Sequence, residues 1–367
     1  MNQKQNLQAL FAGKKTEKLA WTTIADDSTR MSMTEDFRDC SIIEFYRKIG
    51  CDIIQFGNHG LREEEQVRYP FSYNFVGVQK KSEVLQDGSI KKILTTPKGE
   101  LVTILKESHP VRYPVETGEQ LRILLEMWGN ADVVETPNYS TEHFGIAEAI
   151  GDDGLFVPTL TASPIQQLLE YDMGVANFYF LLADHPQEMD ALIREMHRCK
   201  LKEYEFTARN MPFEIIIPIE NTSTAMISPD VFRKYSMEHL SDFTQTMHRY
   251  GKKSIIHMCG HIGKLLNEIR EIRLDGIHAL TEPPVGDCFF EKALDVLGDD
   301  TIIIGTLDST IFQSQSATAD DIEAELERIY TPRIRNSRFV LWPVSDGLPT
   351  ELWRFEAVRE WMETRGS

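Results

Sequence analysis

The chain has 367 residues, and its 39 Lys and Arg against 57 Asp and Glu give a formal net charge of −18. This acidic balance argues against a nucleic-acid backbone or an anionic membrane as the main partner. No stretch reaches the roughly 18 apolar residues of a membrane helix, and the N-terminus lacks the apolar core of a signal peptide. The five cysteines are scattered and odd in number, which argues against a disulfide framework. We therefore expect a soluble, cytoplasmic protein.

Eight short β-rich segments alternate with helical patterns, and most of the segments end in polar residues. The segments are 19–25, 51–57, 155–160, 213–220, 253–260, 275–282, 301–308 and 339–346. Helical patterns at 229–250, 262–272, 289–297, 318–330 and 350–364 lie between or after the later ones. This alternation is typical of βα units with a parallel sheet. Eight such units predict a single α/β domain over 1–367, a (β/α)8 (TIM) barrel.

Two regions add local detail to this prediction. The helix over 229–250 has Ser228 as its N-cap candidate, Pro229 at the first helical position and Gly251 as its C-cap candidate. Residues 70–112 break the βα rhythm, and turn signals at 87–88 and 98–99 predict an antiparallel hairpin insertion after the second strand. The segments 116–150 and 161–208 are expected to be mostly helical.

Potential acids and metal ligands gather where the predicted strands end. Barrel enzymes place their active sites at the carboxyl ends of the strands. These ends supply Asp26, Asp27, Asn58, His59, Glu220, His257, Cys259, His261, Glu282, Asp308 and Asp346. We expect the functional site among these residues.

The sharpest pattern is His257-Met258-Cys259, because residues i and i+2 of an extended strand point to the same side. Imidazole and thiolate together suit zinc. The alternative is a strand end with a buried thiol and a hydrogen-bonded histidine. Glu220 ends the apolar run IIIPIE. A carboxylate there must lie at the mouth of the barrel, be paired with another group or bind a metal. The alternative is that it fixes the loop that follows. Asp346 is either a ligand or a turn-forming residue before Gly347.

Three motifs give the chain a resemblance to a known family. HMCGHIGKLLNEI, LDGIHALTEPPVGD and WPVSDGLP resemble the uroporphyrinogen decarboxylase superfamily, most of all its methyltransferase branch, over about 210–364. The resemblance implies a single (β/α)8 barrel. Decarboxylases of this family carry an arginine-rich signature, approximately FMRQAGR, after the first strand. Here that stretch reads TTIADDSTRM, with only Arg30 nearby, which speaks against a substrate rich in carboxylates.

The methyltransferase branch binds zinc through a His-x-Cys…Cys pattern and moves methyl groups to or from a cobalamin-type corrinoid. His257 and Cys259 match the first two ligands, and Asp346 replaces the second cysteine. The resemblance thus implies zinc held by His257, Cys259 and one or both of Glu220 and Asp346. A carboxylate makes this site harder and more suited to oxygen ligands, so we expect a zinc Lewis acid acting on a methyl ether. The methyl group of a small, methoxylated aromatic donor would pass to a corrinoid protein, as in an O-demethylase.

Further residues at the strand ends receive roles in this hypothesis. Glu220, Asp26 and His59 are the candidate catalytic groups, and Asp27 is a further candidate proton donor. Asp27, Asn58, His261 and Glu282 are candidate substrate contacts. His261 could instead cap the next helix, and Glu282 could be simply solvated.

Three other functions remain open on the sequence. They are a metal-free decarboxylase, a methylcorrinoid:thiol methyltransferase and a binding protein without chemistry. The identity of the methyl donor, the direction of transfer and the oligomeric state, including a homo-oligomer, are open as well.

Overall fold

The computed structural model describes residues 1–14, 16, 18–345 and 347–365. Asp346 lies outside the described residues. No helix among the described residues combines the length and the apolarity that crossing a bilayer requires.

The centre of the molecule is a parallel sheet, as the sequence predicts. Seven strands pair in the order β1-β15-β14-β13-β12-β11-β10, and β2 pairs with β9 in a second parallel sheet. Their bounds are β1 Ala20–Trp21, β2 Ile53–Phe56, β9 Gly154–Val157, β10 Thr159–Leu160, β11 Ile215–Pro218, β12 Lys253–His257, β13 Gly276–Leu280, β14 Ile302–Thr306 and β15 Arg338–Trp342. Each predicted strand segment overlaps at least one of these strands.

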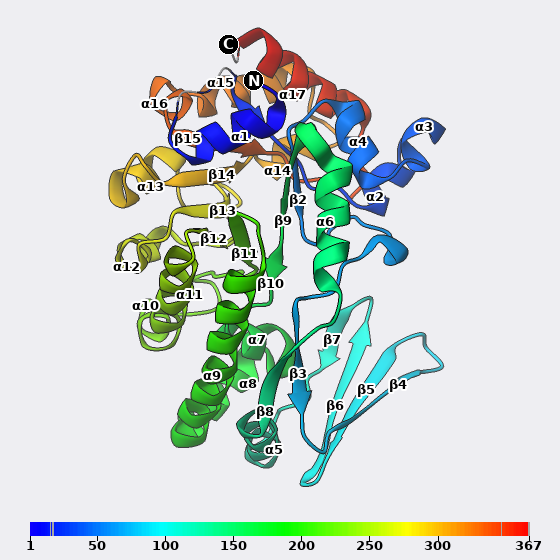
Figure 1. Ribbon diagram of the computed structural model, residues 1–367, viewed down its shortest axis with the longest axis vertical. Helices are drawn as coiled ribbons and strands as arrows, with labels where there is room; N and C mark the ends of the chain where they lie inside the picture. The colour runs from blue at the N-terminus through cyan, green and yellow to red at the C-terminus, as the bar shows by residue number, and fades with distance from the viewer. Residues whose placement is uncertain (15, 17, 346, 366–367) are drawn as a thin grey trace.

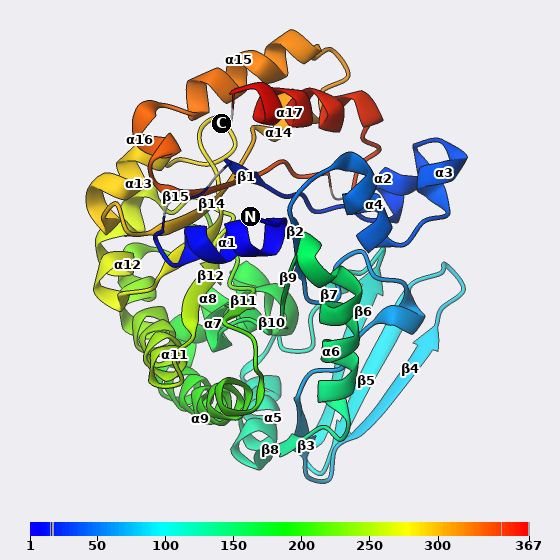
Figure 2. The ribbon, with the colours of Figure 1, turned by 45° about the horizontal axis from the view of Figure 1, so that its top comes forward.

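The two parallel sheets are joined at both edges. The Asp52 amide donates to the Trp21 carbonyl at 2.8 Å, which links β2 to β1. At the other edge β9 runs through Pro158 into β10, and the Ile217 amide donates to the Pro158 carbonyl. In Figure 2 the strands surround a common centre over which α1 (Gln3–Phe11) lies. A continuous, closed ladder of eight strands remains an expectation.

One buried apolar cluster fills this centre. Its strand residues are Ala20, Ile54, Phe56, Val157, Ile215, Ile217, Ile255, Ala279, Ile302, Ile304, Val340 and Trp342. Leu7, Leu10 and Phe11 of α1 belong to the same cluster, so this helix covers the amino-terminal side of the strands. Because the centre is packed with side chains, polar chemistry is confined to the strand ends.

Helices cover the outside of the parallel strands (Figure 1). The longer ones after α1 are α4 Ile42–Ile49, α8 Gly174–Asp184, α9 Pro186–Asn210, α11 Met237–Arg249, α12 Leu266–Ile272, α13 Phe290–Leu297, α15 Ala319–Ile329 and α17 Leu352–Arg365. Short helices are α2 Asp27–Met31, α3 Glu35–Arg38, α7 Pro164–Gln167, α10 Pro229–Val231, α14 Ser309–Phe312 and α16 Pro332–Arg335. Ser228 caps α10 by accepting from the Val231 amide, as predicted. The helix predicted over 229–250 consists of α10, the π-helical turn Phe232–Ser236 and α11.

A separate antiparallel sheet lies beside the parallel strands (Figure 1). Its four strands are β4 Gln79–Val84, β5 Ile90–Thr96, β6 Gly99–Lys106 and β7 His109–Arg112. β3 (Phe71–Phe75) does not pair with this sheet but with β8 (Ala131–Glu135). β8 falls between α5 (Gly118–Gly129) and α6 (Tyr139–Ile150), in a segment whose helical pattern conceals a strand of only five residues.

A buried ion pair on α9 holds β3 and the segment after β10 together. The Lys200 ammonium contacts the Glu203 carboxylate at 3.0 Å, and both side chains are fully buried on α9. Lys200 also donates to the Thr161 hydroxyl, and the Tyr73 hydroxyl of β3 donates to Glu203. Four polar groups from three segments thus satisfy one another away from water.

Replacing one member of this pair should therefore destabilise the protein strongly. We expect Lys200→Met to lower the free energy of unfolding by about 3–5 kcal/mol, because Glu203 is left as a buried, unpaired charge. Lys202, on the same helix, makes an exposed ion pair with Asp132 of β8, so Lys202→Met should cost at most about 1 kcal/mol. Urea denaturation of both variants checks this, and equal effects would contradict it.

Candidate functional site

His257 is the last residue of β12, and its ring is held by a second histidine. Its Nδ1 lies 2.8 Å from Nδ1 of His278 on the neighbouring strand β13. Burial lowers the pKa of His257 to about 4, so the imidazole is neutral at pH 7. A metal-binding histidine generally hydrogen-bonds through its other ring nitrogen. His257 has that partner in His278, which leaves Nε2 for a ligand.

An aromatic cluster lies beside this histidine pair. The ring of His278 is 4.3 Å from the ring of Phe56 and 4.3 Å from the ring of Trp342, measured between centroids. Trp342 is also 6.2 Å from His257. Nε1 of Trp342 and Nε2 of His278 are buried and have no hydrogen-bond partner among the described residues. Side chains from β2, β12, β13 and β15 therefore meet at the carboxyl ends of the strands.

Cys259 follows two residues later and is exposed. Its thiol donates to Oδ1 of Asn221 at 3.5 Å, and Nδ2 of Asn221 donates to Glu170 at 3.2 Å. Although part of the side chain is exposed, desolvation by the surrounding protein, with a smaller effect from Glu170, raises the pKa of the Cys259 thiol. The second oxygen of Glu170 is buried without a hydrogen-bond partner among the described residues. This carboxylate belongs to the site, although the sequence analysis does not identify it.

Glu170 lies on the π-helical turn Leu168–Asp172. Such turns are rare and are frequent at functional sites. The turn sits inside a segment whose pattern indicates plain helix, so no motif marks it. An acidic side chain among apolar neighbours is the one signal that the sequence offers.

Glu220 follows β11, and its side chain is completely buried. Its amide donates to the His257 carbonyl at 3.1 Å, which fixes it beside β12. Its carboxylate accepts from the amide and the hydroxyl of Ser163 at 2.9 and 2.7 Å. Burial raises the pKa of Glu220 to about 8, although the hydrogen bonds from Ser163 act in the opposite direction. The group is therefore mainly protonated at neutral pH.

The metal ligands expected from the sequence lie near one another but are not preassembled. Among the described residues, three potential ligand atoms within 4.8 Å of one another occur in one place, which is His197, Glu238 and Asp242. Glu220 is turned to Ser163 and Cys259 to Asn221, so each predicted ligand is engaged by a protein partner. Asp346 lies outside the described residues.

Asp26 connects the first and last strand loops. One oxygen accepts from the Thr29 amide at the start of α2, and the other accepts from the Gly347 amide, each at 3.2 Å. The carboxylate thus joins the loop after β1 to Gly347, which follows β15. Asp27 is exposed and pairs with Arg30.

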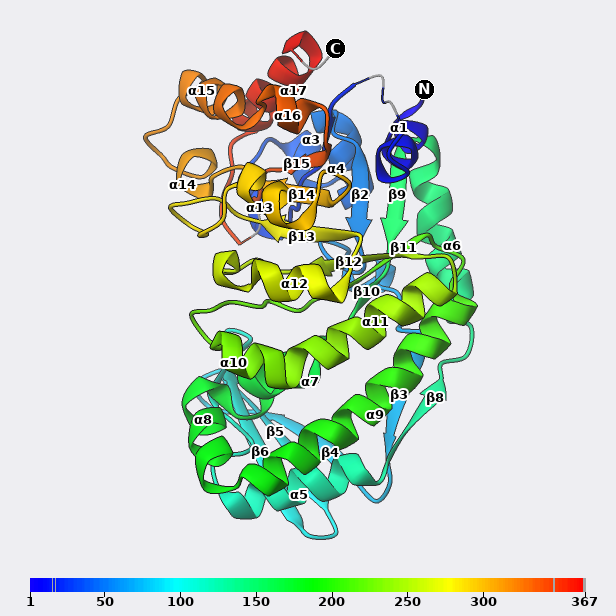
Figure 3. The same ribbon diagram turned by 90° about the vertical axis from the view of Figure 1, so that its left-hand side faces the viewer.

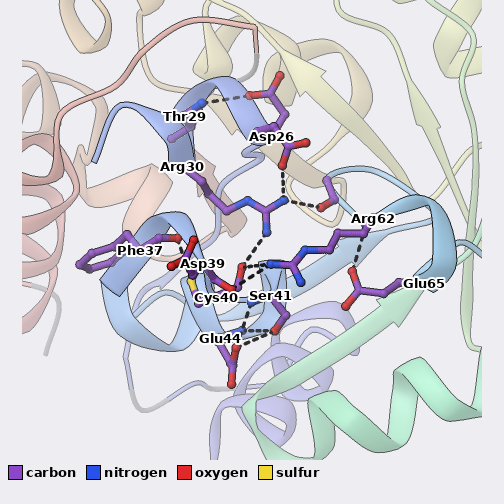
Figure 4. A network of polar contacts seen from close by, with 12 residues as sticks. Asp26, Thr29, Arg30, Phe37, Asp39, Cys40, Ser41, Glu44, Arg62 and Glu65 are labelled. Carbon is purple, nitrogen blue, oxygen red and sulfur yellow. Dashed lines mark hydrogen bonds and ion pairs between the residues drawn. The ribbon is translucent and has the colours of Figure 1, made fainter. Parts of the chain in front are cut away.

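The guanidinium of Arg30 is buried and committed to the protein itself (Figure 4). It donates to the carbonyls of Cys40 and Gly60 and pairs with Asp27. These contacts hold the segment after α3 against α2. They leave this arginine poorly placed to bind a substrate carboxylate.

The remaining candidates mostly fix loops. Asn58 donates to the Val67 carbonyl at 2.8 Å and accepts from the Val67 amide at 2.7 Å. The carbonyl of His59 accepts from Gln55 at 2.7 Å. Glu282 accepts from the Phe290 amide at the start of α13 and pairs with Arg328. Nε2 of His261 lies 3.2 Å from the Val285 carbonyl, on the exposed side of the β12 loop.

The family of the chain follows from a sequence match over its carboxyl-terminal part. A family model described as uroporphyrinogen decarboxylase (URO-D) matches residues 164–365, which is more than half of the chain. The chain belongs to the uroporphyrinogen decarboxylase family. The match covers β11 to β15, Glu170, Glu220, His257 and Cys259, whereas Phe56, Asp26 and His59 lie before the matched part of this URO-D family chain.

Solved structures support the fold of this family member. A structure described as a methyltransferase from Methanosarcina mazei is similar over 100% of this chain and 99% of that chain, with a TM-score of 0.58 and 13% identity. A D-psicose 3-epimerase in the presence of D-fructose covers 56% of this chain and 69% of its own, with a TM-score of 0.33 and 11% identity. The second likeness is too loose to carry an argument. No curated protein matches the chain in sequence.

The raised pKa of Glu220 predicts a pH-dependent stability of the metal-free URO-D family protein. A folded pKa of about 8 against an ordinary value of 4.5 means that the contribution to stability is full below pH 4.5 and is lost as the pH rises toward 8. The loss is at most about 5 kcal/mol for one group. Glu220→Gln should remove this part of the slope, since glutamine does not titrate.

Urea denaturation of the metal-free protein between pH 5 and about 8.5 measures this difference. The exposed Glu214→Gln, which lies just before β11, is the matched control and should keep the wild-type slope. Parallel curves for wild type and Glu220→Gln would show that Glu220 is not protonated in the folded protein.

Proposed function

We propose that this URO-D family protein is a zinc-dependent methyltransferase of the O-demethylase type. It would move a methyl group from a small methoxylated, aromatic substrate to a corrinoid carried by a partner protein. The observation that carries the proposal is the His257–His278 pair at the end of β12 with Cys259 two residues further on. The similarity in fold to the Methanosarcina mazei methyltransferase over the whole chain agrees with it.

The residues present fit a zinc ion. His257 is neutral with Nε2 available, and the exposed Cys259 is held only by a 3.5 Å contact to Asn221. Glu170 has a buried oxygen without a partner among the described residues, which a cation would satisfy. We therefore propose His257, Cys259 and Glu170 or Asp346 as the ligands, with Glu220 as the remaining candidate. Bound zinc would supply a Lewis acid for the oxygen of a methyl ether.

Glu220 is better suited to proton transfer than to metal binding. Its raised pKa keeps a proton on a carboxyl group that lies directly beside β12, and Ser163 holds it in place. A protonated acid near neutral pH can transfer its proton to a leaving phenolate oxygen. Asp26 and His59 lie on the loops after β1 and β2 and remain further candidates for this role.

The aromatic cluster suits an aromatic methyl donor. Phe56, His278 and Trp342 form a wall of rings beside His257, and offset or edge-on ring contacts stabilise an arene in such a place. The buried N–H of Trp342 adds a hydrogen-bond donor without a partner among the described residues. The exposure of Cys259 leaves the strand ends open to the corrinoid protein.

Arg30 favours methyl transfer over decarboxylation. A substrate with several carboxylates needs free cationic groups, and the guanidinium of Arg30 is engaged by two carbonyls and Asp27. A thiol-directed methyltransferase would gain from a second thiolate on zinc, and Asp346 stands where the family has that cysteine. The ligand set proposed for zinc therefore favours a substrate whose methyl group is bound to oxygen.

Methyl transfer to free reduced cobalamin tests this function. The zinc-loaded protein is incubated with methoxylated arenes, a methylamine and a methylated thiol, and formation of methylcobalamin is followed by absorbance. With a methoxyarene as the donor, we expect methylcobalamin and the corresponding free phenol to form in equal amounts. Release of carbon dioxide from uroporphyrinogen without any methyl transfer would overturn it, and transfer from the thiol alone would reassign the substrate class.

A further inference from the structure

A second group of potential metal ligands lies between two helices on the outside of the parallel sheet and shares no residue with the proposed strand-end ligands. His197 comes from α9, and Glu238 and Asp242 come from α11, which packs against α9 (Figure 3). Ligand atoms of all three lie within 4.8 Å of one another. Glu238 and Asp242 are four residues apart on one helix, so they share a face. We propose that His197, Glu238 and Asp242 bind a divalent transition-metal cation such as Zn²⁺ and clamp α9 to α11.

A buried chain of polar groups orients the histidine of this site. Nδ1 of His197 lies 2.8 Å from Nδ1 of His239, which is buried, and Nε2 of His239 is hydrogen-bonded to the Tyr204 hydroxyl. His197 thus has a partner for one ring nitrogen, as metal-binding histidines generally do. Its Nε2 faces Asp242 at 2.9 Å. The ring is fixed with its second nitrogen toward the carboxylates.

The proton positions allow a cation to bind without loss of a proton. Without a cation, the Tyr204 hydroxyl donates to Nε2 of His239, and Nδ1–H of His239 donates to Nδ1 of His197. Nε2–H of His197 then donates to Asp242. With a cation on Nε2 of His197, the proton of that ring is on Nδ1 and is donated to Nδ1 of His239. The proton of His239 is then on Nε2 and is donated to the Tyr204 oxygen. Each ring keeps one proton, and both arrangements satisfy the nitrogens of both rings.

Charge and space also fit a dication. Two carboxylates and a neutral imidazole balance two positive charges, and nitrogen with oxygen donors suits zinc, cobalt or nickel. A cavity of about 220 Å³ lies against the site and leaves room for water ligands. Arg194 and Lys234 line the same cavity, and the ammonium of Lys234 is engaged by Asp190 and the Tyr235 hydroxyl.

The site is independent of the one proposed at the strand ends and contains no sulfur ligand. Zn²⁺ binding is measured by equilibrium dialysis of the full chain carrying His257→Ala and Cys259→Ala, which removes the other site. We expect one Zn²⁺ per chain in this background. Adding His197→Ala or Glu238→Gln should abolish the binding, and Glu238 is exposed, so its replacement leaves the fold intact. His248→Ala is the matched control, because His248 lies on the same helix, α11, and pairs only with Asp275, which lies just before β13.

A thermal readout tests the clamp itself. Zn²⁺ should raise the melting temperature of the same background protein, and the rise should disappear with Glu238→Gln but persist with His248→Ala. The proposal is overturned if the His257→Ala, Cys259→Ala protein folds and binds no Zn²⁺, or if Glu238→Gln and His197→Ala bind as much Zn²⁺ as their background. In otherwise wild-type protein, Glu238→Gln should lower the bound Zn²⁺ by one equivalent per chain, whether or not a metal binds at the strand ends.

Discussion

Cys259→Ser is expected to lower zinc-dependent methyl transfer by at least about 100-fold, because a zinc Lewis acid supplies several kcal/mol to the reaction. The thiolate is the softest ligand proposed at the strand ends, and a serine hydroxyl replaces it poorly. The Cys259 side chain is exposed, so the variant should fold as the wild type does. Initial rates of methylcobalamin formation at saturating donor give the size of the effect.

Cys40→Ser is the matched control for this prediction. Cys40 lies after α3, and its thiol donates to the Phe37 carbonyl, a contact that serine can also make. Its activity should stay within about twofold of the wild type, since a substitution away from the site changes little. Full activity of Cys259→Ser would remove the thiolate from the mechanism.

The second large effect is expected for Glu170→Gln. If Glu170 is a ligand or orients one, its replacement should weaken zinc binding about 10- to 100-fold. Glutamine keeps the hydrogen bond to Asn221 but lacks the negative charge that would neutralise a bound cation. Zinc affinity is measured by competition with a chelator of known strength.

The outcome for Glu170 separates charge from geometry. Unchanged zinc affinity in Glu170→Gln, with a loss in Glu170→Ala, would mean that the side chain only positions Asn221. The exposed Glu63→Gln, in the loop after β2, controls for a general loss of negative charge and should bind zinc as the wild type does.

Regular hydrophobic patterning made most of the parallel strands predictable. Runs such as 215–218 and 302–306 are mainly apolar because both faces of each strand are covered, and this continuous burial is visible in the sequence. The short β8 was not predictable in the same way. It lies between two helices, and its pairing with β3 depends on a contact about 60 residues away in the chain.

Local spacing is the strongest sequence guide to the candidate site, and a metal shared by His257 and Cys259 stays a prediction. His257 and Cys259 are two residues apart at a strand end, so the sequence alone places them together. Glu282 and Asn58 show the limit of that reasoning, because the same polar residue types at strand ends also cap helices and fix loops. Glu170 was missed because it reaches the site through a π-helical turn, whose geometry no residue pattern encodes.

Absorption of the cobalt(II)-substituted protein tests most directly whether His257 and Cys259 hold a metal. A thiolate bound to cobalt gives an intense near-ultraviolet charge-transfer band, and the outer site of His197, Glu238 and Asp242 has no sulfur to produce one. We predict this band in the wild type and in Glu238→Gln, and its loss in Cys259→Ser. Absence of the band in the wild type at saturating cobalt, or its persistence in Cys259→Ser, would contradict a metal at the end of β12.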